Sequence, residues 1–183
     1  MSALIRLDLV LREALERPYR DLVTRSTGAA VRDRVVTVLR ATAERDALLD
    51  FSEVGVVDFS CADEVVAKLL QMFEADGLPV SRVLLRGLSE DHVDAIEHVL
   101  RHHGLVIVAG CVGASAPRIL GDIDADHRAA FDALAGFGRA PAAPVADMLA
   151  WPVDRARSAL QALVGRRCVL AHPDATFELG AVA

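Results

Sequence analysis

The first 110 residues alternate between strand-like and helix-like patterns of apolar positions. Strand patterns cover Leu4–Leu11, Ala47–Phe51, Val80–Arg86 and Leu105–Ala109. Between them, apolar residues three and four positions apart predict helices that begin near Ser26, Ser60 and Ser89. Strands that alternate with helices in this way predict an α/β layer structure with a mostly central, buried sheet.

The second predicted helix has a polar start and a long apolar face. Ser60 stands where an N-cap residue belongs, because its hydroxyl can accept a hydrogen bond from a free amide of the first turn. Asp63 and Glu64 follow in that turn, where the helix dipole favours negative charge. The apolar residues of the face are Val65, Val66, Leu69, Leu70 and Phe73.

The chain after residue 125 follows a different pattern. Helices are predicted over about 126–137, 144–149 and 152–164, the last with Pro152 at its first position. Two short strands, 168–172 and 176–179, then flank a Pro-Asp-Ala turn and predict a hairpin. We therefore predict a first domain over 1–111, a linker over 112–125 and a second domain over 126–183.

Composition and charge narrow the class of protein. Hydrophobic residues make up 53% and charged residues 25%, which is enough to bury a core. The net charge of -6 argues against a protein that mainly coats nucleic acid, because phosphates attract basic surfaces. No apolar run is long enough for a bilayer, and the three cysteines are too widely spaced for a disulfide framework. We expect a cytoplasmic protein that does not bind membranes.

Two short segments of the first domain resemble the STAS family, the domain of anti-sigma factor antagonists and sulfate transporter tails. Leu49–Val54 reads L-D-F-S-E-V and Val57–Ala62 reads V-D-F-S-C-A. The chain is more similar still to the STAS-like domain of unknown function, because Thr24-Arg25 precedes the first helix and S-C-A-D-E over 60–64 opens the second. The resemblance covers roughly residues 1–110, and it implies an α/β regulatory domain.

The resemblance implies a phosphorylation switch at Ser60. In antagonist STAS domains the serine at this helix start is phosphorylated by a kinase of the histidine-kinase-like ATPase superfamily, which is also the anti-sigma factor. Cys61 and Ala62 replace the glycine and leucine of that pattern. A purely structural cap at Ser60 remains the alternative. We expect partner binding at Asp58, Ser60, Asp63 and Glu64, where the three acids would repel a phosphate and so release the partner.

The second domain resembles a winged helix-turn-helix. The likeness rests on the element order and on the string L-A-W-P-V-D-R-A-R-S-A-L over 149–160. If it binds DNA, the arginines that would do so are Arg155, Arg157, Arg166 and Arg167. The alternative is a winged helix that serves for protein contact or dimerisation, because the range 126–183 carries six arginines and six acidic residues and is neutral.

Three other groups of residues suggest chemistry only weakly. Asp94, His98 and His102 share one helix face next to His103, but no further ligand cluster accompanies them. The loop Gly110–Ser115 lacks the lysine of a phosphate loop, so we interpret it as a turn. Acidic neighbours should raise the pKa of Cys61. We expect no metal, no cofactor and no enzymatic activity.

The sequence thus favours a cytoplasmic signalling protein that acts through protein–protein interaction. Its partner is expected to be a serine kinase of the histidine-kinase-like ATPase superfamily, acting as an anti-sigma factor. The alternative is a transcription regulator that binds DNA through its C-terminal domain. A homodimer is plausible for either function.

Overall fold

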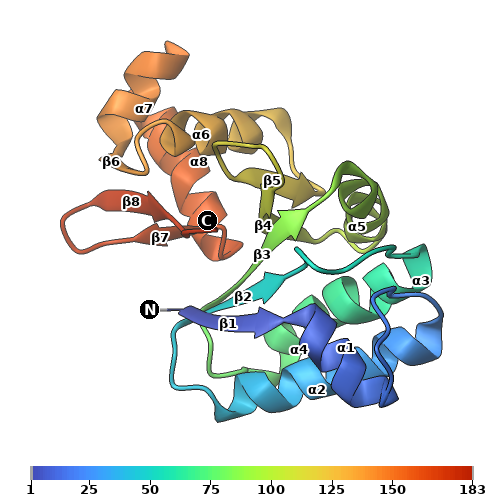
Figure 1. Ribbon diagram of the computed structural model, residues 1–183. Coiled ribbons are helices and arrows are strands. Elements are labelled where there is room, and N and C mark those ends of the chain that lie inside the picture. Colours follow the sequence, from blue (N-terminus) through green and yellow to red (C-terminus); the bar gives the residue numbers. More distant parts are fainter. Residues whose placement is uncertain (1, 183) are drawn as a thin grey trace.

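A five-stranded sheet runs through the middle of the molecule, in a computed structural model that describes residues 2–182 (Figure 1). Its strands lie in the order β1-β2-β3-β4-β5. The first four are parallel and β5 is antiparallel to β4. The predicted α/β class is therefore confirmed. The bounds are β1 Ser2–Arg6, β2 Asp46–Asp50, β3 Arg82–Leu88, β4 Val106–Cys111 and β5 Arg118–Gly121.

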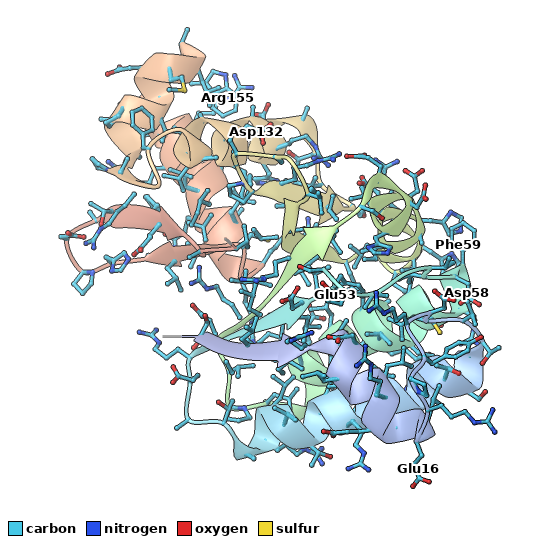
Figure 2. All side chains as sticks on the ribbon, viewed as in Figure 1. Glu16, Glu53, Asp58, Phe59, Asp132 and Arg155 are labelled. Carbon is cyan, nitrogen blue, oxygen red and sulfur yellow. The ribbon has the colours of Figure 1, made fainter. Side chains whose placement is uncertain are left out.

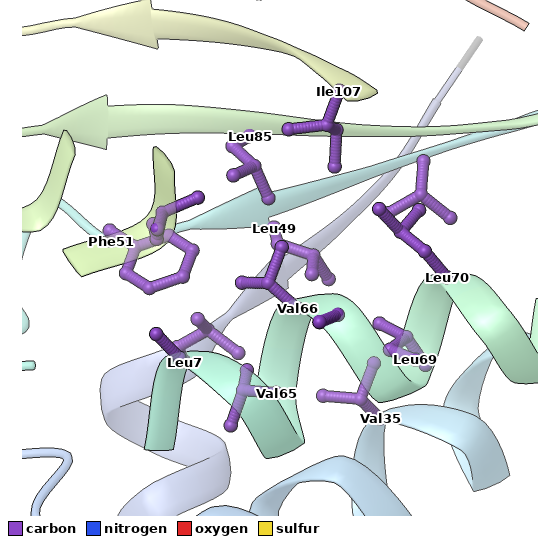
Figure 3. Close-up of a cluster of buried hydrophobic side chains, with 14 of the residues drawn as sticks. Leu7, Val35, Leu49, Phe51, Val65, Val66, Leu69, Leu70, Leu85 and Ile107 are labelled. Atoms are coloured by element: carbon purple, nitrogen blue, oxygen red, sulfur yellow. The ribbon is translucent and has the colours of Figure 1, made fainter. Parts of the chain in front are cut away.

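Helices from the first part of the chain cover one face of this sheet. They are α1 Leu7–Leu15, α2 Arg25–Ala41, α3 Phe59–Ala62, η1 Asp63–Lys68, α4 Leu69–Asp76 and α5 Glu90–His102. The segments α3, η1 and α4 follow one another directly, and η1 is wound as a π-helix. Figure 3 shows their apolar side chains: Val66 and Leu70 point towards the sheet, and Val65 and Leu69 lie on the side of α1 and α2, near Leu7 and Val35.

The last third of the chain covers the opposite face. It comprises α6 Ala125–Ala135, β6 Arg139–Pro141, α7 Ala142–Leu149, α8 Val153–Gly165, β7 Val169–Ala171 and β8 Thr176–Leu179. Leu48, Leu84 and Val108 point towards these elements. Their neighbours along the strands point to the other face, towards the helices of the first part of the chain. Both faces are thus buried, which explains why the central strands read as continuous apolar runs.

The predicted hairpin is confirmed, because β7 pairs antiparallel with β8. β8 also pairs with β6, a strand that the sequence pattern did not predict. Three residues that include a proline carry too little periodicity to predict a strand. Pro152 is the N-cap of α8 and not its first residue, a shift of one position from the prediction.

The predicted strand over Leu4–Leu11 is wrong beyond Arg6. Leu7, Val10 and Leu11 are buried while Leu9 is 43% exposed, which is the spacing of a helix face and not of a strand. The alternation of apolar and polar residues at the start of this segment matches a strand only over the length of one helical turn. β1 therefore ends early, and α1 begins directly after it.

The range 112–125, predicted as a linker, contributes a strand to the main sheet. β5 occupies residues 118–121, and its Ile119 and Leu120 are buried. The division into two domains stays a prediction. Within the described residues, no helix combines the length and apolar character needed to span a bilayer.

Candidate functional site

The residue that caps α3 is Asp58 and not the predicted Ser60. The Asp58 carboxylate accepts hydrogen bonds from the Cys61 amide at 2.7 Å and from the Ser60 hydroxyl at 2.8 Å. Ser60 is the second residue of the helix. Aspartate and serine are both good N-cap residues, so the spacing D-F-S leaves two choices, and the structure takes the first.

The same carboxylate joins two segments that are far apart in sequence. Its Oδ2 atom accepts a hydrogen bond from the Thr24 amide at 2.9 Å, across 34 positions. Burial alone would raise the pKa of Asp58, but the hydrogen bonds from Thr24, Cys61 and Ser60 outweigh it and hold this pKa below its ordinary value. Asp58 is therefore a carboxylate at neutral pH, with three donors around it.

Thr24 adopts a backbone conformation that is rare for a β-branched residue, with φ 73° and ψ 140°. Besides the bond to Asp58, its carbonyl oxygen accepts the Cys61 thiol at 2.9 Å and the Gly28 amide at 3.1 Å. Gly28 itself lets α2 approach α3 closely, because a Cβ at this position would lie 2.9 Å from the Cβ of Glu64. The starts of α2 and α3 are thus locked together.

The two acids after α3 lie in a network of charges. Arg25 donates from one nitrogen to Asp63 at 2.8 Å and to Glu64 at 2.9 Å. Arg32 and Lys68 also pair with Glu64. Burial raises the pKa of both acids, but these cations outweigh it and keep both pKa values below the ordinary range. Both side chains are therefore ionised and compensated.

This network corrects two expectations. Glu64 is 3% exposed, so its carboxylate is not available to a partner as predicted. The expected cluster of repelling acids is also wrong, because Arg25, Arg32 and Lys68 balance the charge around Asp63 and Glu64. Arg25 and Arg32 stand 32–39 positions before the acids, and Lys68 stands one helical turn after Glu64. Of the three acids, Asp58 alone accepts no hydrogen bond from a cation within residues 2–182.

A cavity of about 430 Å³ lies beside Ser60. Its lining comes from the starts of α2, α3 and η1 and from the end of α5, and consists of Arg25, Phe59, Ser60, Asp63, His98, Val99, His102 and His103. The Phe59 side chain is 57% exposed, and its ring lies 4.9 Å from the ring of His98 (Figure 2). The sequence analysis missed Phe59, although an aromatic residue at the first position of a helix is the signal that could have found it.

The histidines of α5 contact other side chains. His103 contacts Asp63 at 2.7 Å and Gln71 at 3.2 Å, and His98 stacks on Phe59. No group of three histidine, cysteine or acidic side chains with metal-site geometry exists within residues 2–182. Asp94 and His102 lie at the neighbouring charged cavity of about 840 Å³.

The Cys61 thiol is poorly suited to act as a nucleophile. Burial and then the negative charge of Asp58 raise its pKa to about 12, so the thiol is protonated. It donates its proton to the Thr24 carbonyl. Its role at the helix start is therefore a packing and hydrogen-bonding role.

The four arginines predicted to contact DNA do not form one surface. Arg155 makes a bidentate pair with Asp126 and stacks over Trp151, and Arg157 pairs with its neighbour Asp154 at 3.4 Å. At the other end of α8, Arg166 and Arg167 bind the first part of the chain: Arg166 donates to the carbonyls of Gly104 and Asp122, and Arg167 stacks on Phe73 at 4.1 Å. About ten positions along α8 separate the two pairs, which corresponds to roughly 15 Å along the helix axis.

Comparisons with protein families, with curated proteins and with solved structures found no significant match to this chain.

Proposed function

We propose that this chain is a regulatory protein that binds a protein partner at the start of α3. The observation that carries the proposal is the cavity beside Ser60, with the exposed ring of Phe59 at its edge. Exposed aromatic side chains are enriched at the centres of protein interfaces. The helix start that presents Phe59 is fixed by Asp58, so the surface needs little ordering when a partner binds.

The packing around this surface supports the resemblance to a STAS-like domain. The two segments that carry the resemblance, Thr24-Arg25 and 58–64, meet in space through hydrogen bonds from Thr24 to Asp58 and from Arg25 to Asp63. A sequence pattern whose separate parts meet at one place is better support than either part alone. We propose on this basis that the partner is an ATP-using serine kinase that also acts as an anti-sigma factor.

Phosphorylation of Ser60 would act on Asp58 in this proposal. The Ser60 hydroxyl now donates to the Asp58 carboxylate, and a phosphate at this oxygen has no proton to donate there. About two negative charges would then stand beside a carboxylate that caps α3 and holds Thr24. Repulsion from Asp58 would loosen this helix start, and the partner would lose a preformed surface.

A pull-down with four variants tests the proposal. The wild type should retain a kinase of the expected class from an extract of its own cells, and Ser60→Asp and Phe59→Ala should each lose it. Ser158→Asp and Phe137→Ala make the same chemical changes at exposed positions of the C-terminal part, and should retain the partner. Equal capture by all five proteins would refute the proposed surface.

The C-terminal part favours a second candidate function, DNA binding through a winged helix. The pairing of β6 with β8 completes a three-stranded sheet that accompanies three helices. The chain order α6, β6, α7, α8, β7, β8 is the order of elements in a winged helix. Arg166 and Arg167 contact the first part of the chain and Arg155 is paired with Asp126, so Arg157, whose contact with Asp154 is 3.4 Å long, is the arginine of the four best placed to contact a phosphate. A DNA-binding screen at two salt concentrations tests it: affinity should fall at higher salt and in the Arg157→Gln variant.

A further inference from the structure

A third cavity, of about 530 Å³ and open to solvent, lies at the carboxyl ends of β2, β3 and β4. Ser52 follows β2, Arg86 and Gly87 end β3, and Cys111 ends β4. The carboxyl ends of parallel strands form one wall of the cavity, and its volume is within the usual range for small-molecule sites. The loop after β4, which the sequence analysis interpreted as a turn, forms part of the lining.

The opposite wall comes from the C-terminal part of the chain. It consists of residues that follow α6 and of the tail after β8, from Leu179 to Val182. Gly110 lets this tail lie against β4, because a Cβ there would stand 2.8 Å from the Val182 carbonyl oxygen. A molecule in this cavity would therefore touch both parts of the chain.

The cavity combines one cation with a mainly apolar lining. The Arg86 guanidinium is 32% exposed and makes one polar contact within the described residues, from Nε to Asp50 at 3.2 Å. The acid of the lining, Glu178, is already partnered by His172 at 2.6 Å. Small apolar residues, among them Ala116 and Pro117, supply much of the remaining surface. The terminal nitrogens of Arg86 are thus left to bind an anion.

We propose that this cavity binds a small organic anion, with its carboxylate on Arg86 and its apolar body against the loop after β4. A guanidinium binds a carboxylate through parallel, charge-assisted hydrogen bonds. The apolar lining requires that the rest of the ligand be an aliphatic or aromatic group. This site is separate from the surface at Ser60, and the inference does not depend on the proposed function.

The test uses the full chain and benzoate as the probe, followed by backbone amide NMR up to about 20 mM benzoate. Benzoate should shift the amides of Gly87, Gly110 and Ser115. Benzyl alcohol, which keeps the phenyl ring but lacks the carboxylate, should bind at least about tenfold more weakly. The absence of benzoate shifts at these amides, or equal affinity for the two probes, would overturn the proposal.

Two variants and a control locate the site. Arg86→Gln should weaken benzoate binding at least about tenfold, but it also leaves Asp50 without its cation. Ala116→Trp instead fills the cavity from an exposed position and keeps the pair of Arg86 with Asp50, and it should abolish binding. Arg101→Gln removes an exposed arginine of α5 and should leave the affinity unchanged. Unchanged affinity in Ala116→Trp would place benzoate elsewhere and refute the site.

Discussion

Replacement of Asp58 by alanine should destabilise the fold far more than replacement of Ser60. The Asp58 carboxylate accepts three hydrogen bonds, from the Cys61 amide, the Thr24 amide and the Ser60 hydroxyl. Ser60 contributes only the last of these, and it does so as a donor. If Ser60 were the cap, as the sequence alone predicts, the order of the two variants would be reversed.

The expected magnitude follows from the bonds that each variant removes. Loss of an N-cap acceptor costs about 1 kcal/mol. Loss of the bond to the Thr24 amide adds about 1 kcal/mol, because this amide lies in a constrained turn. Asp58→Ala should therefore lower the free energy of unfolding by about 2 kcal/mol, and Ser60→Ala by less than about 0.5 kcal/mol.

Urea unfolding measures this difference. With a slope of about 2 kcal/mol per molar urea, Asp58→Ala should lower the midpoint by about 1 M. Ser89→Ala, which removes the N-cap hydroxyl of α5, provides the reference for the loss of a cap alone. A midpoint for Ser60→Ala at or below that of Asp58→Ala would refute the assignment of the cap.

The pH dependence gives a second, independent check. The pKa of Asp58 is lower in the folded chain than in the unfolded chain, so its contribution is present above the unfolded pKa of about 4. That contribution is lost as the pH falls through the folded value. The gap between wild type and Asp58→Ala should thus narrow below about pH 4, while the gap for Ser89→Ala should not follow this titration.

Three further predictions concern the packing around the site and between the two parts of the chain. Gly28→Ala should cost about 1–3 kcal/mol in urea unfolding, because its Cβ would lie 3.0 Å from the Cα of Cys61. Glu64→Gln should cost about 1–2 kcal/mol in the same measurement, because the buried amide pairs less well with Arg25, Arg32 and Lys68, which solvent partly screens. Arg167→Ala should remove its contact with Phe73 and raise the hydrogen exchange of β7, at a cost of about 0.5–1 kcal/mol.

The elements that the sequence predicted best have both a clear period of apolar residues and a clear capping residue at their boundary. α5 is the clearest case, since Ser89 caps it, and Val93, Ile96 and Leu100 are buried as predicted. The strand prediction failed after Arg6 because one turn of an amphipathic helix shows the same alternation of apolar and polar residues as a strand. β6 was missed because a three-residue strand is defined by its partner β8 and has no pattern of its own.

The candidate site was predictable in its position but not in its electrostatics. The acids and hydroxyls near residue 60 were identified from their spacing along one helix start. Part of the charge that balances Glu64 comes from Lys68, one helical turn later, and the rest from Arg25 and Arg32, which lie on another helix. Arg166 was predicted to bind DNA because the sequence does not reveal its partners Asp122 and Gly104, which stand 44 and 62 positions away. Local sequence reveals which groups carry charge, whereas tertiary packing decides which of them are free.

The way in which the segment between the two proposed sites is held indicates that the sites act independently. It runs from Ser52, at the cavity of Arg86, to Asp58, at the start of α3. Backbone hydrogen bonds hold it at Val54 and Gly55, and His92 of α5 contacts the Gly55 carbonyl at 2.6 Å. Coupling between sites needs an element with two arrangements that both ligands can bias, and a segment held at successive points is a poor candidate for one. An anion bound at Arg86 should therefore change the state of Ser60 little, and its main effect should be on the contact between the two parts of the chain.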